Sequence, residues 1–70
     1  MHDEDLRKKL GLLIRQAREA KGWTHYEVYK RTQIGVTHLV KIEEGVYSIR
    51  IDILQKICEA LDLKVKFPLK

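Results

Sequence analysis

The stretch THYEVYKRTQIGVTHLVKIEEG, residues 24–45, decides the fold that the sequence predicts. Thr24 and Glu27 have the spacing of a capping box, in which each side chain binds a backbone N–H group at the start of a helix. Trp23 before the cap and Val28 after it have the spacing of a hydrophobic staple, which fixes the direction of entry into the helix. A helix is therefore expected from His25 to about Thr32.

A second short helix follows after a tight turn. Residues 36–44 place Leu39 and Ile42 on one face, and Gly45 stands where helices commonly end. The turn covers residues 33–35, where Gly35 is free to take a positive φ. The stretch thus predicts two helices joined by a turn.

Outer helices are expected on both sides, over residues 5–21 and 51–61, because apolar residues recur there every three to four positions. Gly22 follows the first outer helix as a C-terminal cap. Arg50, a poor N-cap residue, precedes the second. The expected fold class is all-α, a compact four-helix domain with its core in residues 6–62.

The length and cysteine content limit what can stabilise this core. Seventy residues make one domain, residues 1–70, and a chain this short buries only about 60% of its unfolded surface. The single cysteine, Cys58, cannot form an internal disulfide, and no Cys/His set has zinc spacing. We therefore expect no metal and no cofactor, and a partner chain as the supplement to the core.

The end of the chain changes its pattern. Residues 63–67 alternate apolar side chains with lysine, which predicts a short C-terminal β-strand. A lone strand in a helical chain has nothing to pair with, so we expect it to pair with the same strand of a second molecule. This interpretation gives a homodimer with Leu63, Val65 and Phe67 as its dimerisation residues.

The charge favours a polyanionic partner. The net charge is +4, with 14 basic and 10 acidic residues, and three of the acids lie in the first five residues, MHDED. Residues 6–70 therefore carry 14 basic against 7 acidic side chains, a balance of +7. DNA, RNA and an acidic protein all fit this charge.

Membrane association is not expected. No apolar run approaches the roughly 18–20 residues of a membrane span, and the acidic start is unlike a secretory signal. We therefore expect a cytoplasmic protein.

From Leu10 to Leu61 the sequence resembles the lambda-repressor/Cro (Xre) family of helix-turn-helix DNA-binding domains. The matching pieces are IRQAREAKGWT, EVYKRTQIGVTHLVKIEEG and LQKICEALDL. The ending LDLKVKFPL resembles the C-terminal strand of antitoxins similar to HipB. The resemblance implies a sequence-specific transcriptional regulator, a repressor, that binds palindromic double-stranded DNA as a homodimer through the helix at residues 36–44.

The resemblance also implies roles for individual residues. Side chains at the start of the third helix would meet base edges in the major groove; they are Val36, Thr37, Val40 and Lys41. Side chains at the start of the second helix and in the loop after the third would contact phosphates; they are His25, Tyr47, Ser48 and Arg50. Arg18 and Glu43 would form a partly buried structural ion pair.

Several of these assignments have plain alternatives. Val36 and Val40 could be exposed apolar residues without a partner, His25 could be a solvated histidine, and Tyr47 could pack under its loop. Tyr29 occupies a position where the family usually has a small residue.

The rival function is a protein-interaction module or an antitoxin that binds and neutralises a partner toxin. An enzyme is not expected, because no catalytic constellation is present and Cys58 lies on the apolar face of a helix. No small-molecule ligand is expected either.

Overall fold

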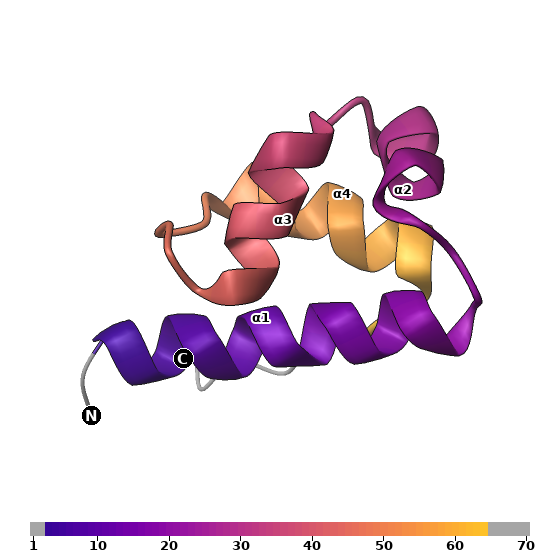
Figure 1. The fold of residues 1–70 in the computed structure, drawn as a ribbon. Helices are drawn as coiled ribbons and strands as arrows, with labels where there is room; N and C mark the ends of the chain where they lie inside the picture. The colour runs from indigo at the N-terminus through magenta and orange to yellow at the C-terminus, as the bar shows by residue number, and fades with distance from the viewer. Residues whose placement is uncertain (1–2, 65–70) are drawn as a thin grey trace.

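A computed structural model describes residues 3–64 of the chain. This part consists of four helices: α1 (Asp3–Ala20), α2 (His25–Thr32), α3 (Val36–Glu44) and α4 (Ile51–Leu61). The helices α2, α3 and α4 gather on one side of α1, which runs the length of the molecule (Figure 1). The expected all-α class is confirmed for the described residues.

The bounds of α2, α3 and α4 agree with the prediction, whereas α1 begins two residues earlier and ends one residue earlier. It starts at Asp3. Its end is set by Gly22, which has φ +70°. The Trp23 N–H then donates to the Arg18 carbonyl at 3.2 Å, closing the helix in a Schellman-type cap.

The C-terminal strand falls almost wholly outside the described residues. Of residues 63–67, only Leu63 and Lys64 are described, and neither belongs to a strand. Leu63 packs against the core, and its N–H donates to the Cys58 carbonyl at 2.9 Å. The pairing expected of Val65 and Phe67 concerns residues beyond the described part.

The predicted capping box at the start of α2 is present. The Glu27 N–H donates to Thr24 Oγ1 at 3.2 Å, and the Thr24 N–H donates to Glu27 Oε1 at 2.8 Å. Trp23 packs against the core cluster that contains Val28, as the hydrophobic staple requires. This local pattern explains why the start of α2 could be predicted to the residue.

The turn between α2 and α3 differs from the prediction in one respect. Gln33, not Gly35, takes the positive φ, at +64°, while Gly35 has φ −55° and is the N-cap of α3. The reason is that the left-handed residue must directly follow the last residue of α2, so that the Gln33 N–H can reach the Tyr29 carbonyl at 2.7 Å. Thr32 supports the turn, since its buried hydroxyl accepts from the Ile34 N–H at 3.1 Å.

The core lies between the four helices and is wholly apolar apart from Thr32. Three residues are essentially inaccessible, Ile14, Leu39 and Ile57. Each of the four helices contributes at least one buried residue. Besides these three, the buried apolar residues are Val28, Ile34, Ile42, Leu54 and Leu61. Tyr29 is half-buried and packs against this core, so the large side chain is accommodated beside it.

Gly11 sets the closest approach between α1 and α3. A Cβ atom there would lie 2.4 Å from the Glu43 carbonyl oxygen and 2.6 Å from that of Ile42. Both atoms belong to the backbone of α3, so they cannot rotate away. The absence of a side chain at Gly11 thus lets α1 lie directly against the C-terminal turn of α3.

We predict that Gly11→Ala separates α1 from α3 and lowers the free energy of unfolding by about 1–3 kcal/mol, the usual effect of overpacking. Urea unfolding followed by Trp23 fluorescence measures this loss. The matched control is Gly35→Ala, where an added Cβ meets no atom within 4 Å. That change affects only the N-cap preference and should remove less than about 1 kcal/mol. Equal losses in the two variants would contradict the close approach.

Candidate nucleic-acid interface

The outward face of α3 carries the residues expected to meet bases. Leu39 and Ile42 point into the core, and the helical period places Thr37, Val40 and Lys41 on the opposite side. Thr37 is exposed, Val40 and Lys41 are half-buried, and Val36 at the helix start is 38% exposed. The structure therefore brings all four candidates to one accessible surface.

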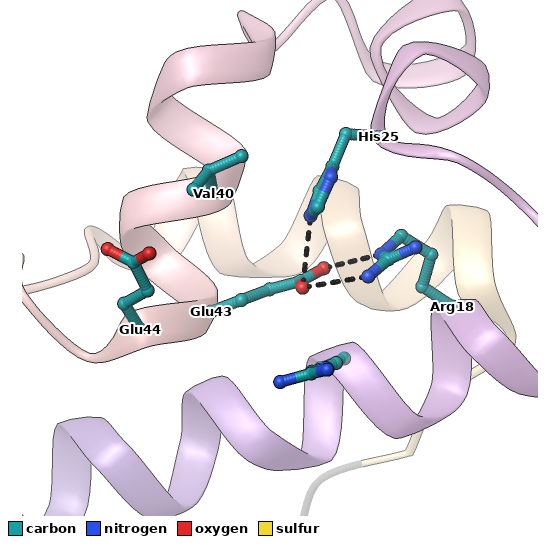
Figure 2. A pocket seen from close by; sticks show the side chains of 6 residues that line it. Arg18, His25, Val40, Glu43 and Glu44 are labelled. Carbon is teal, nitrogen blue, oxygen red and sulfur yellow. Dashed lines mark hydrogen bonds and ion pairs between the residues drawn. The ribbon is translucent and has the colours of Figure 1, made fainter.

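Glu44 shares this face and was not identified from the sequence. It lies one turn beyond Val40, is exposed, and points away from the neighbouring side chains of α1 and α2 (Figure 2). Its carboxylate would repel a nearby phosphate and could accept a hydrogen bond from a base amino group. The spacing of three from Lys41 and four from Val40 was the sequence signal that could have revealed it.

The expected ion pair between Arg18 and Glu43 is present and bidentate. Arg18 Nε donates to Glu43 Oε2 at 2.7 Å, and Arg18 Nη2 donates to Oε1 at 3.1 Å. The side chains are 12% and 7% exposed. Hydrogen bonding to Glu43 raises the pKa of the Arg18 guanidinium above its ordinary value, so it stays charged at every physiological pH. Its remaining Nη1 donates to the Trp23 carbonyl at 2.8 Å.

His25 joins this ion pair, which sequence reasoning did not foresee. Its Nε2 lies 3.0 Å from Glu43 Oε1, and the side chain is 27% exposed. Figure 2 shows Arg18 and His25 converging on the Glu43 carboxylate from α1 and from the start of α2. One carboxylate thus ties α3 to both of its neighbours, and we call Arg18, His25 and Glu43 the carboxylate cluster. No pattern in the sequence pairs His25 with a residue 18 positions later.

The loop after α3 brings the other phosphate candidates to the surface. Tyr47 is 43% exposed, and its ring lies edge-on against His38 of α3, with centroids 5.4 Å apart. Ser48 and Arg50 are also exposed, and Arg50 Nε lies 3.4 Å from Asp52 Oδ1.

Arg7 adds a positive charge to this loop and was missed in the sequence. Its Nη1 donates to Ser48 Oγ at 3.3 Å, while its buried Nε has no hydrogen-bond partner among the described residues. Because the contact joins positions 41 apart, only the fold reveals it.

Two observations on the described residues concern nucleophilic side chains and metal ligands. Burial raises the pKa of the Cys58 thiol, which lowers its thiolate fraction and hence its nucleophilicity. No group of three or more His, Cys, Asp or Glu side chains within residues 3–64 could hold a metal ion. The two described histidines do not share a partner, since His25 contacts Glu43 and His38 contacts Tyr47. None of the helices described is long and apolar enough to cross a membrane.

We predict that Glu43→Gln lowers the free energy of unfolding by about 3–5 kcal/mol, because it leaves the Arg18 charge buried without its counter-ion. Thermal and urea unfolding measure the loss. The matched control is Asp62→Asn, which breaks the exposed pair between Lys21 and Asp62 at 3.1 Å. That pair should contribute less than about 1 kcal/mol. A Glu43→Gln variant as stable as the Asp62→Asn control would contradict the structural role of the cluster.

Comparison with known proteins agrees with this geometry. No curated protein and no solved structure gives a significant match to the chain. A family model described as helix-turn-helix matches residues 14–67, which is more than half of the chain and includes α2, the turn and α3. The chain therefore belongs to the helix-turn-helix family of DNA-binding domains, of the Xre/lambda-repressor-like kind.

Proposed function

We propose that this chain is a sequence-specific transcriptional repressor that binds palindromic operator DNA as a homodimer. The observation that carries the proposal is the accessible face of α3, with Thr37, Val40 and Lys41, on a helix held to its neighbours by the carboxylate cluster. A helix of this size fits the major groove of B-DNA, where side chains near its N-terminus meet base edges. Membership of a helix-turn-helix family supports DNA as the partner.

The side chains of α3 can contact bases both by hydrogen bonds and by apolar methyl contacts. Lys41 can donate to guanine O6 and N7, and Thr37 can form a hydrogen bond with a base or a phosphate. The methyl groups of Val36 and Thr37 can contact the methyl group of thymine. Glu44 on the same face would disfavour any register that brings a phosphate against it.

Phosphate contacts would supply most of the affinity. The basic excess of the chain and the positive end of the α2 dipole both favour an anion. The candidate donors are His25 at the start of α2 and three residues after the end of α3, which are Tyr47, Ser48 and Arg50. Arg7, in contact with Ser48, would add to the positive field of that loop.

A homodimer would supply the specificity that one short helix cannot. A two-fold dimer places its recognition helices about 34 Å apart, on half-sites one turn of DNA apart. The pairing segment proposed for it is the alternating tail, with Leu63, Val65 and Phe67. Similarity of this tail to that of HipB-like antitoxins would add a toxin as a second partner.

A protein-interaction module is the second candidate function. Val36, Val40 and Tyr29 are the residues that would favour it, because apolar side chains suit a protein interface. Tyr29 packs against the core and is half-buried, so it offers little surface to a partner. Val36 and Val40 alone make a small apolar contact beside Lys41 and Glu44, which favours DNA over a protein as the ligand of α3.

We expect selection from a random duplex pool at moderate salt to enrich a palindrome. Thr37→Ala and Lys41→Ala should relax the preference at their own positions, by about 1–3 kcal/mol for each lost bidentate base contact. The matched control is Lys56→Ala, which removes the same charge from the exposed face of α4. It should leave the sequence preference unchanged.

Salt separates this function from its rival. Affinity for the enriched duplex should fall with a log–log slope of about −0.9 for each phosphate contact. No enrichment, or binding of a protein partner with little response to salt, would contradict DNA reading by α3.

We predict that deleting residues 65–70 gives monomers in light scattering, whereas the full chain has twice the monomer mass of 8.3 kDa. The deletion spares Leu63, which packs against the core, so the four helices should stay folded. The matched control is Lys66→Ser, which removes a lysine and keeps the apolar residues of the tail. A persistent dimer after the deletion would contradict the role of the tail.

A further inference from the structure

The protonation of His25 follows from its contact with Glu43. The Glu43 carboxylate is nearly buried and bidentate to Arg18, so it is ionised and can only accept hydrogen bonds. An interaction of 3.0 Å between His25 Nε2 and Glu43 Oε1 therefore requires a hydrogen on Nε2. The carboxylate selects one tautomer of the neutral ring.

The other ring nitrogen is then unsuited to a phosphate. A neutral imidazole carries one N–H group, so Nδ1 of His25 presents a lone pair. Within residues 3–64 no hydrogen bond to this atom is formed, and the side chain is partly exposed at the first residue of α2. A phosphate oxygen would meet a lone pair when the ring is neutral and an N–H donor when it is protonated.

The charges around the ring nearly balance. A cavity of about 210 Å³ next to it is lined by Arg15 and Arg18 from α1 and by Glu43 and Glu44 from α3. On α2 itself, the Glu27 carboxylate accepts from the Thr24 N–H. Arg18 is bound to Glu43 and Arg15 to Glu19, so neither arginine is an uncompensated cation beside the ring.

We propose that His25 binds a DNA phosphate only in its protonated form, so that DNA binding takes up a proton at this residue. The inference rests on the proposed function and adds a pH dependence to it. A phosphate beside the ring favours the charged form, and the charged form donates a charge-assisted hydrogen bond through Nδ1 while Nε2 stays on Glu43.

The sign of the effect follows from this linkage. A protonated His25 can donate to a phosphate and a neutral one cannot, so lowering the pH favours binding and lowers the Kd for DNA. Uptake of one proton limits the change to about tenfold per pH unit.

The first test concerns the free protein and needs no DNA. Nitrogen-15 NMR of the full chain distinguishes the two neutral tautomers of a histidine ring. We expect His25 to carry its proton on Nε2 at high pH and on both nitrogens at low pH. A neutral ring with its proton on Nδ1 would overturn the inference.

The second test measures the Kd for the enriched duplex from pH 6 to pH 8 at constant ionic strength, for the wild type, His25→Gln and His38→Gln. Glutamine can donate a hydrogen bond but cannot change its charge, so His25→Gln should flatten the pH dependence. His38→Gln should retain it, because His38 contacts Tyr47 on another flank of α3. Calorimetry in buffers of different ionisation enthalpy should find up to one proton taken up by the wild type and none by His25→Gln.

The outcomes separate the inference from the proposed function. Tight, sequence-selective binding with the same pH slope in the wild type and His25→Gln would overturn the inference and leave the function intact. Failure of the wild type to bind any duplex at any pH in this range would overturn both. If His25→Gln is too unstable to assay, the wild type alone still tests the inference. A neutral ring protonated on Nδ1, or DNA binding without proton uptake, would overturn it.

Discussion

The structure depends most on one buried carboxylate, that of Glu43. It is 7% exposed and receives hydrogen bonds from Arg18 of α1 and His25 of α2. An ionised group so well buried is tolerated only when its partners are correctly placed, so it strongly disfavours arrangements in which α3 has turned or slid. The same end of α3 lies directly against Gly11 of α1, where a single added carbon would not fit. The hydrogen-bonded carboxylate and the close packing at Gly11 thus both hold the C-terminal end of α3 in place.

This arrangement separates the supporting part of α3 from the part that is free to bind. Leu39, Ile42 and Glu43 are committed to the interior, while Thr37, Lys41 and Glu44 face outward. Because a helix is rigid over nine residues, anchoring one face orients the other. The outward face of α3 carries both a positive and a negative side chain. These charges affect how tightly the face binds a polyanion, and they also constrain the position in which it can bind.

The sequence was most informative where structure is local. The capping box at Thr24, the glycine after α1 and the apolar periods gave the helices almost to the residue. The ion pair of Arg18 and Glu43 came from family resemblance, since nothing in the spacing of two residues 25 positions apart predicts a contact. His25 at Glu43, Arg7 at Ser48 and the role of Gly11 escaped prediction for the same reason. They are tertiary contacts, and only the packing of the helices creates them.

The turn shows how tertiary structure can override a local preference. Left-handed backbone at Gln33 is less favourable than at glycine by about 1–2 kcal/mol, yet the turn has the geometry that a glycine would allow. Its hydrogen bonds account for this: the buried Thr32 hydroxyl donates to the Val28 carbonyl and accepts from the Ile34 N–H, and Gln33 Nε2 donates to the Lys30 carbonyl. Ile34 is itself part of the core, so releasing the strain would expose it. The angle between α2 and α3 is therefore set by buried contacts on both sides of the turn, and a residue unfavourable in isolation can stand there without displacing the outward face of α3.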